Sequence, residues 1–292
     1  MRAILLALAL AAGPAAAQAP AKPMTSNDVA ALPASVPYIR ASYGFGPIEV
    51  GELRLPPGKG PFPVAVIIHG GCWVKGMATM RMTAPIADAL TARGFATWNV
   101  EYNQLDDPDG GWPGTFQDWS MAVDHLRVLI KSEPLDLKRV IVVGHSAGGH
   151  AALWLATRGH AAGKLAGDNP VPVRAVVDID GPVDLVDILP DEMSVCGRPV
   201  VEQLLGGKPD AQPDHYKIGN PAQNLPFHVR QLLVTSKLLT PAKADAYAAK
   251  ARAAGDQVEI LNLTGVGHFE PVAPGTPAWA KVEAFIVEQA LK

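Results

Sequence analysis

Arg139-Val140-Ile141-Val142-Val143-Gly144-His145-Ser146-Ala147-Gly148-Gly149-His150 is the stretch that decides the fold. The apolar run before Gly144 predicts a buried strand, and the small residues of 147–157 predict a helix. Between them lies Gly-x-Ser-x-Gly, which is typical of a nucleophile elbow. A serine on such a strained turn stands clear of the sheet, and glycines on either side leave room for it. The alternative interpretation is a glycine-containing turn whose serine caps a helix.

The composition is that of one globular α/β domain. The chain has 292 residues, of which 48% are hydrophobic and 18% are charged, and its formal net charge is −3. A chain of this length and hydrophobic content is long enough to bury a single hydrophobic core. No block of Lys and Arg interleaved with aromatic residues is present, so nucleic acid is not an expected partner.

The first 17 residues predict a signal peptide. Arg2 forms a short positive region, and the apolar run from Ile4 to Ala12 is too short to span a bilayer. Small residues at 15–17 predict cleavage before Gln18. We therefore expect an exported protein, periplasmic or secreted, without stable membrane insertion after cleavage; an uncleaved anchor is the alternative. Residues 18–35 are expected to be a flexible leader, and residues 36–292 the folded domain.

The remaining pattern predicts an α/β fold with a mostly parallel central sheet and helices on both faces. In such a sheet, ligands bind beyond the carboxyl ends of the strands. The irregular, Pro- and Gly-rich residues 183–227 are expected to form a small lid insertion over the pocket. The expected strands are 38–43, 49–55, 64–68, 95–102, 139–145, 174–180, 231–236 and 258–263, and the expected helices are 83–93, 115–131, 147–157, 242–254 and 279–291.

The loop after the predicted strand at 64–68 reads His69-Gly70-Gly71-Cys72-Trp73. Gly70 and Gly71 have no side chains to shield their backbone N–H groups. Together with the N–H of Ala147, which follows the elbow serine, they predict an oxyanion hole.

His268 is the predicted general base. It lies on a glycine-flanked loop after the last expected strand, where its ring can reach Ser146. His69 is expected to shape its loop, and His145 and His150, which flank the nucleophile, are expected near the pocket.

Together these features resemble the α/β-hydrolase superfamily, and within it the esterase branch of feruloyl-esterase-like and kynurenine-formamidase-like enzymes. The resemblance covers about residues 38–292. It implies Ser146 as nucleophile, His268 as general base and oxyanion donors near Gly70, Gly71 and Ala147. It rests on His69-Gly70-Gly71-Cys72-Trp73, Trp98-Asn99-Val100-Glu101-Tyr102, Gly111-Trp112-Pro113-Gly114-Thr115-Phe116, Gly144-His145-Ser146-Ala147-Gly148-Gly149-His150 and Gly267-His268-Phe269.

The acid of the triad is missing from its usual place. The family usually carries an Asp after the strand that is here 231–236, but this chain continues with Lys237-Leu238-Leu239-Thr240-Pro241. Loss of the acid costs a serine protease about 10⁴ in turnover. Asp180, at the end of the preceding expected strand, is the best substitute. The fallback candidates are Asp184, Asp245 and Glu270.

Cys72 and Cys196 are the only cysteines. In an exported protein they form either a disulfide or two separate, partly buried thiols. Trp73, Trp112 and Trp119 are expected either to shape a substrate pocket or to belong to the core.

The sequence thus predicts a serine hydrolase that cleaves a small-molecule carboxylic ester through an acyl-enzyme. No metal or cofactor is expected. The alternatives are a non-catalytic binding protein on the same fold and an amidase or exopeptidase-like hydrolase.

Overall fold

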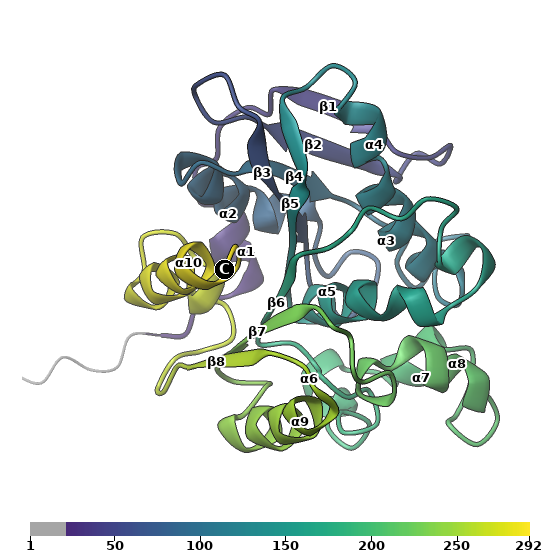
Figure 1. Ribbon diagram of the computed structural model, residues 1–292. Helices are drawn as coiled ribbons and strands as arrows, with labels where there is room; N and C mark the ends of the chain where they lie inside the picture. Colours follow the sequence, from purple (N-terminus) through teal and green to yellow (C-terminus); the bar gives the residue numbers. More distant parts are fainter. Residues whose placement is uncertain (1–21) are drawn as a thin grey trace, which may run out of the picture.

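The computed structural model describes residues 22–292, so the predicted signal peptide lies outside the described residues. Eight strands form one sheet in the order β1-β2-β4-β3-β5-β6-β7-β8 (Figure 1). The pairings β1–β2 and β2–β4 are antiparallel and all the others are parallel, as predicted. The strands are β1 (Ile39–Ser42), β2 (Val50–Arg54), β3 (Phe62–Ile68), β4 (Ala96–Val100), β5 (Leu135–His145), β6 (Ala175–Ile179), β7 (Arg230–Thr235) and β8 (Val258–Asn262).

Helices cover both faces of the sheet, with α1, α2 and α10 on one side and α3 and α5 on the other (Figure 1). The helices are α1 (Ser26–Ala30), α2 (Met80–Ala92), α3 (Gly114–Asp124), α4 (Leu126–Leu129), α5 (Ala147–Thr157), α6 (Glu192–Cys196), α7 (Val200–Leu204), α8 (Pro213–Gly219), α9 (Pro241–Ala254) and α10 (Pro277–Gln289).

The central strands are apolar throughout because both of their faces are buried. In β3, Val64, Val66 and Ile68 pack into the core on the α3 and α5 side, whereas Ala65 and Ile67 pack into the core on the α2 and α10 side. This alternation fixes the register of the sheet. It therefore also fixes which loops emerge together at the carboxyl ends of the strands.

Two helix predictions differ from the structure. The helix expected at 83–93 begins at Met80, because the side chain of Thr79 caps it by accepting from the N–H of Arg81. The helix expected at 115–131 is interrupted at His125, between α3 and α4.

Within the segment expected to be a flexible leader, residues 26–30 fold as α1. Thr25 and Asp28 form a capping box at its start. Val29 is fully buried in the core on the α2 side, and the side chain of Glu270 accepts from the N–H of Met24 at 2.9 Å. A single buried valine in an Ala- and Pro-rich segment gives no periodic pattern, which is why the sequence did not reveal this docking.

Residues 183–227, the expected lid, contain three short helices, α6 to α8. Their apolar side chains are part of the main core, and two N–H groups at the start of α7 donate to the buried carboxylate of Glu192. Only the part around Ile188 and α6 borders the space beside Ser146. The segment is therefore packed into the core over most of its length, and only this part forms a wall of the site.

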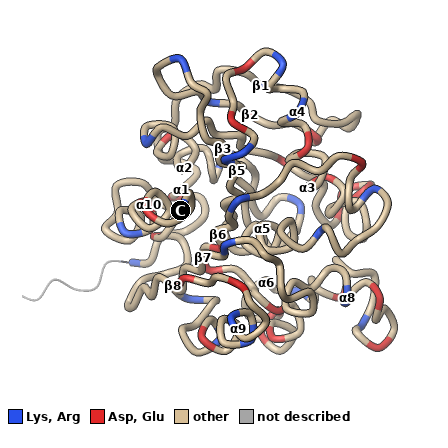
Figure 2. Tube along the Cα trace, in the orientation of Figure 1, with Lys and Arg blue, Asp and Glu red and all other residues tan. Residues whose placement is uncertain are grey.

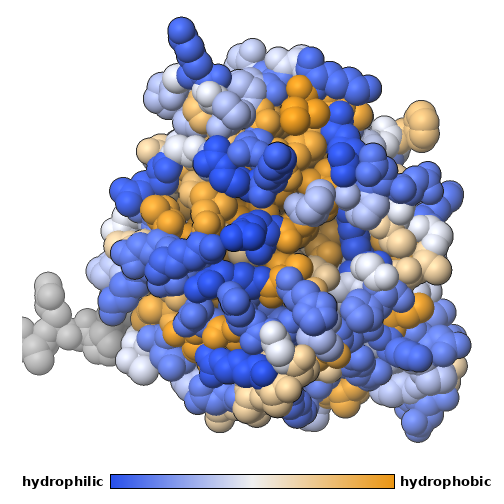
Figure 3. All heavy atoms as spheres, in the orientation of Figure 1, coloured by the Kyte–Doolittle hydropathy of each residue, from blue (hydrophilic) through white to orange (hydrophobic). Residues whose placement is uncertain are grey.

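Positive and negative side chains are interspersed along the trace (Figure 2), in keeping with the small net charge. In the view of Figure 3 the surface is mostly hydrophilic, with apolar patches between the hydrophilic residues. Within residues 22–292, no helix combines the length and the apolar character that crossing a bilayer requires.

Candidate active site

Ser146 lies on a sharp turn between β5 and α5, with φ 55° and ψ −122°. The residues two positions before and two positions after Ser146 must be glycine. A Cβ on Gly144 would lie 1.8 Å from the carbonyl oxygen of Gly148, and a Cβ on Gly148 would lie 2.2 Å from that of Ile68. The N–H of Ser146 donates to the carbonyl of Ile179 at 3.0 Å, which ties the turn to β6. The Gly-x-Ser-x-Gly pattern is therefore required by contacts at this turn.

His268 and Asp180 are in direct contact. The Nδ1 of His268 lies 2.6 Å from Oδ2 of Asp180, which directly follows β6. Asp180 has a φ of 55°, an uncommon conformation for a residue with a side chain, and its side chain is completely buried. Because an ionised carboxylate only accepts hydrogen bonds, Nδ1 carries the proton, and Nε2 is the nitrogen left to act as a base.

The loop after β7, where the family resemblance led us to expect the acid, supplies donors instead. Asp180 accepts the hydroxyl of Ser236 at 2.9 Å. It also accepts consecutive backbone N–H groups at 2.8 to 3.1 Å, those of Ser236, Lys237, Leu238 and Leu239. Burial raises the pKa of Asp180, but the hydrogen bonds from His268 and from this loop outweigh it, so the pKa lies below its ordinary value. Asp180 is therefore an anion at neutral pH.

Ser146 and His268 line one cavity of about 250 Å³. Its other walls are mainly apolar and include Met77, Met82 and Phe269. The structure records no hydrogen bond of the Ser146 hydroxyl within residues 22–292. Nucleophile–base contacts are often loose in empty sites and shorten when substrate enters, so this geometry is compatible with catalysis.

Gly71 and Cys72 line this cavity, whereas Gly70 does not. Gly70 lies against the elbow, because a Cβ there would lie 2.9 Å from Cβ of Ser146. The N–H groups of Gly71, Cys72 and Ala147 have no acceptor in the described part of the chain. The N–H of Gly70 also has no acceptor there, so the donors expected at Gly70, Gly71 and Ala147 stay a prediction, and Cys72, which lines the cavity, is a further candidate donor.

Three left-handed residues in succession shape the oxyanion loop. Gly71, Cys72 and Trp73 have φ values of 101°, 52° and 57°. This conformation costs a residue with a side chain about 1–3 kcal/mol, so other contacts must hold it. A disulfide between Cys72 and Cys196 links the loop to α6, which decides between the two alternatives that the sequence left open.

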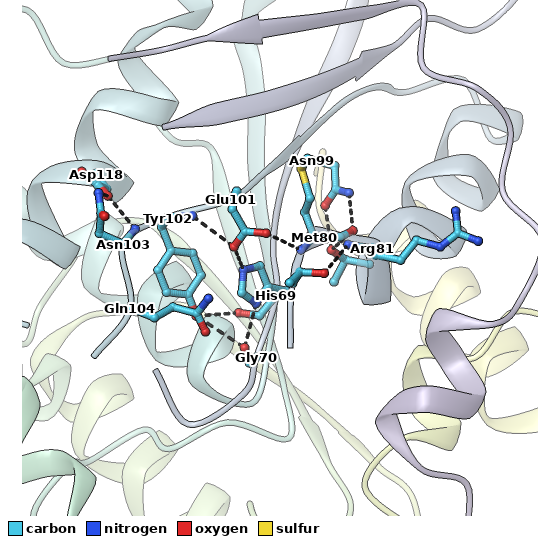
Figure 4. Close-up of polar contacts among 12 residues, drawn as sticks. His69, Gly70, Met80, Arg81, Asn99, Glu101, Tyr102, Asn103, Gln104 and Asp118 are labelled. Atoms are coloured by element: carbon cyan, nitrogen blue, oxygen red, sulfur yellow. Dashed lines mark hydrogen bonds and ion pairs between the residues drawn. The ribbon is translucent and has the colours of Figure 1, made fainter. Parts of the chain in front are cut away.

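His69 supports the loop from behind, as expected (Figure 4). Its Nε2 lies 2.5 Å from Oε1 of Glu101, its Nδ1 lies 2.8 Å from the carbonyl oxygen of Gly70, and its ring stacks on Tyr102. Glu101 also accepts the N–H of Met80 at 3.0 Å. Burial alone would raise the pKa of Glu101. The charge and the hydrogen bond of His69 lower it by a larger amount, so the pKa lies below its ordinary value. Sequence reasoning missed Glu101, although its place after β4 was a signal.

His145 and His150 have different roles. The Nε2 of His145 donates to the carbonyl of His268 at 2.9 Å, and burial, with the neighbouring His268 charge, lowers the pKa of His145 to about 3. This neutral ring therefore positions the backbone of the base. His150 does not line the pocket. It lies among aromatic side chains with Trp119, its Nε2 donates to a carbonyl, and burial lowers its pKa to about 4.

The other candidate acids do not contact His268. Asp184 accepts from the side chain of Asn220, Glu270 accepts from Met24, and Asp245 is exposed. Trp119 belongs to the buried core, while Trp73 lines the space beside Ser146. Trp112 stacks on His215, away from Ser146.

Comparisons with known proteins bear on the family and the fold of the chain. A family model described as BD-FAE matches residues 52–229. Among solved structures, a truncated carbohydrate esterase from gut microbiota is 22% identical, with a TM-score of 0.71, over 89% of this chain and 98% of that chain. Esterase B from Lactobacillus rhamnosis is 18% identical, with a TM-score of 0.72, over 90% of each chain.

Esterase 2 of Thermogutta terrifontis, solved after phosphonylation by sarin, is 15% identical, with a TM-score of 0.69, over 87% of this chain and 96% of that chain. At these identities the structural likeness establishes the fold. A search of curated proteins by sequence gave no match.

Proposed function

Since the chain belongs to the BD-FAE family and has the α/β-hydrolase fold, we propose that it is a serine esterase that cleaves carboxylic esters of small molecules. The observation that carries the proposal is the 2.6 Å contact between His268 and the buried Asp180, on the cavity that Ser146 also lines. An anionic acid, an oriented imidazole and a serine on an elbow are the three parts that acyl transfer needs.

In the proposed reaction, the Ser146 oxygen attacks the carbonyl carbon while its proton moves to Nε2 of His268. The resulting oxyanion is held by the N–H groups of Gly71, Cys72 and Ala147. The ester C–O bond then breaks, and His268 protonates the departing alkoxide. Water, deprotonated by the same nitrogen, attacks the acyl-enzyme, and the carboxylic acid leaves as Ser146 recovers its proton. Asp180 remains ionised throughout and stabilises the imidazolium.

We also propose that the protein is exported. Residues 1–17 carry the pattern of a signal peptide. The disulfide between Cys72 and Cys196 supports the same conclusion, because such bonds persist in oxidising compartments.

Replacement of the nucleophile tests the proposed activity. With 4-nitrophenyl acetate as substrate, Ser146→Ala is expected to lower kcat by on the order of 10⁶, since loss of a catalytic serine has an effect of that size in a comparable triad. Ser132→Ala, an exposed serine just before the end of β5 opposite to Ser146, is the matched control and should retain full activity. An organophosphate should label the wild-type protein and not Ser146→Ala.

Two results would contradict the proposal. Ester turnover that survives Ser146→Ala would assign the reaction to another group. A wild-type protein that binds esters but neither cleaves them nor reacts with the organophosphate would be a binding protein on this fold. Parallel assays with the matching amide would reveal an amidase.

A further inference from the structure

His145 ends β5 and lies where the nucleophile, the base and the oxyanion loop meet. It directly precedes Ser146 in the chain, and its buried ring lies beside that of His268, with 4.5 Å between the ring centroids. It also adjoins the oxyanion loop, since a Cβ on Gly70 would lie 2.8 Å from the carbonyl oxygen of His145 and 3.3 Å from its Nδ1. A ring enclosed in this way has little freedom to move and can serve as a fixed support.

The hydrogen bond of His145 defines its tautomer. Its Nε2 lies 2.9 Å from the carbonyl oxygen of His268, and a carbonyl oxygen only accepts, so Nε2 carries the proton. Nδ1 is buried and has no partner among residues 22–292. A second proton on Nδ1 would therefore be a buried donor without an acceptor, which is costly. The geometry thus favours the neutral ring.

The surroundings of His145 favour the neutral ring as well. The groups whose charges act on it are His268, from the loop after β8, and Asp180, from the end of β6. Phe269 and the backbone of Gly70, which also adjoin it, carry no charge. Burial and, to a smaller extent, the charge of His268 lower the pKa of His145 to about 3. When His268 becomes an imidazolium during the reaction, His145 therefore adds no second positive charge.

His268 is held by three hydrogen-bonded contacts. Asp180 lies 2.6 Å from Nδ1 of the ring. The hydroxyl of Ser236 donates to the carbonyl of Gly267 at 2.7 Å, and His145 donates to the carbonyl of His268 itself. A single hydrogen bond at Nδ1 leaves an imidazole free to tilt, so the direction of Nε2 also depends on where the backbone is held. Of the three contacts, His145 is the one that holds this backbone and also packs against the ring.

We propose that His145 is a positioning residue for the base: its neutral ring, through the hydrogen bond to the His268 carbonyl, keeps Nε2 of His268 directed at Ser146. This inference rests on the esterase activity proposed above and assigns a further residue to the same site. A displacement of about 1 Å can cost about 10²-fold in rate. Loss of the hydrogen bond should therefore lower turnover and leave ester binding nearly unchanged.

Two replacements of His145 separate its hydrogen bond from its packing. The amide nitrogen of Gln can take the place of Nε2 and donate to the same carbonyl, whereas Phe keeps a ring and removes the donor. With 4-nitrophenyl acetate, we expect His145→Phe to lower kcat by about 10- to 100-fold with KM within about threefold. His145→Gln should recover kcat to within about threefold of wild type. Wild-type kcat in His145→Phe, or equal losses in both variants, overturns the inference and leaves the esterase proposal standing.

His215 supplies the matched control. Its Nδ1 contacts a backbone carbonyl, that of Leu205 at 2.7 Å, and its ring stacks on Trp112, but it does not line the cavity of Ser146. His215→Phe thus removes the same kind of contact elsewhere, and its kcat and KM should equal those of wild type. A loss of kcat as large as that of His145→Phe would show a general effect on the fold and contradict a specific role of His145.

The pH profile tests whether His145 stays neutral. If His268 alone titrates, kcat/KM should fall by about tenfold per pH unit on the acid side, which is the slope of one proton. His145→Gln should keep this slope and its position. A slope of two protons in wild type that becomes one in His145→Gln would show that His145 ionises, and would overturn the inference.

A measurement without substrate separates this inference from the esterase proposal. The proton on Nδ1 of His268, shared with Asp180, should give a low-field ¹H NMR resonance that Asp180→Asn abolishes. We expect the resonance to persist in His145→Gln and to shift or disappear in His145→Phe. An unchanged resonance in a folded His145→Phe protein contradicts the inference. If wild type cleaves no ester and Ser146 is not labelled, the esterase proposal fails, and this resonance still decides whether His145 positions His268.

Discussion

The groups that carry the proposed chemistry and the walls that surround them are held in different ways. Ser146 and Asp180 follow strands in the middle of the sheet, and Asp180 is fixed by His268 and by consecutive N–H groups of the loop after β7. The walls include α1 and α6, helices of five residues each. One is held mainly by the buried Val29 and the other by a disulfide.

Isolated helices this short are unstable in water, so α1 and α6 exist only through their attachments. The sheet side, by contrast, is held by many hydrogen bonds that no single change removes. We therefore expect changes on the sheet side to reduce turnover. Changes in the walls should alter which esters bind and how well.

The largest effect is expected from Asp180→Asn. The amide oxygen can still accept from the loop after β7, so the fold should survive. His268, however, loses its anionic partner, and its ring is no longer held in the tautomer with the proton on Nδ1. We expect kcat to fall by about 10⁴ with little change in KM, as in a serine protease with the same replacement. Asp245→Asn, an exposed fallback acid, is the control and should behave as wild type. A decrease below tenfold would mean that Asp180 only supports the loop.

The same contrast explains what the sequence could predict. The sequence predicts Ser146 and His268 because each follows a recognisable strand and lies beside glycines; at Ser146, a Cβ on either Gly144 or Gly148 would clash with the backbone. Asp180 was reached by elimination. The hydrogen-bond donors that surround Asp180 could not be predicted, because most of them are backbone N–H groups, which carry no residue signature. The same holds for the oxyanion donors: the sequence pointed to Gly70 and Gly71, whereas Gly71 and Cys72 are the loop residues that line the cavity.

The walls were much less predictable. The docking of α1 depends on one buried valine in a segment whose composition is typical of a flexible leader. The cysteines of the disulfide are 124 positions apart, and no local pattern links residues at that distance. Long-range contacts between irregular segments are thus the part of the site that the sequence leaves open.

The next largest effect is expected from loss of the disulfide. Cys72→Ser combined with Cys196→Ser should lower the free energy of unfolding by about 2–5 kcal/mol, because the bridge closes a long loop. It should also lower kcat/KM by between about 10- and 100-fold, less than the 10²–10³ that loss of a whole oxyanion donor costs. Urea denaturation and acetate hydrolysis give the two numbers. Wild-type values for both would show that packing alone holds α6 in place.

A smaller effect is expected from detaching α1. Val29→Asp places a charge in the core on the α2 side, which should release the helix while the sheet stays folded. Ser26 lines the cavity that Ser146 and His268 share, so KM for an aryl acetate should rise by between about 2- and 10-fold with kcat within about twofold. Val36→Asp, at an 88% exposed valine seven residues further along the chain, is the control. Limited proteolysis should cut residues 22–33 in Val29→Asp only, and a large decrease in kcat would contradict the separation of walls and chemistry.

The smallest effect on activity is expected at Asp178, two residues before Asp180. Asp178 is completely buried, and Oδ1 accepts only the N–H of Gly181 at 2.8 Å, while Oδ2 has no partner among the described residues. Burial raises its pKa well above the ordinary value, and the charge of Asp180 adds to this. Of two carboxyls on one strand end, Asp178 is therefore neutral and Asp180 ionised.

The two carboxyls should make stability depend on pH in opposite directions. The folded state keeps a proton on Asp178 that the unfolded chain loses above about pH 4, so Asp178 makes stability fall by up to about 1.4 kcal/mol per pH unit from pH 4 to its folded pKa. Asp180, with its lowered pKa, contributes stability that is lost as pH falls below about 4. Asp178→Asn should therefore raise stability at pH 8 more than at pH 5 and leave kcat unchanged, as measured by urea denaturation at both values. Asp210→Asn, an exposed control, should not change the pH dependence. If Asp178→Asn and wild type keep a constant difference in stability across this range, Asp178 is ionised in the fold, and the sheet side holds two adjacent buried anions instead of one.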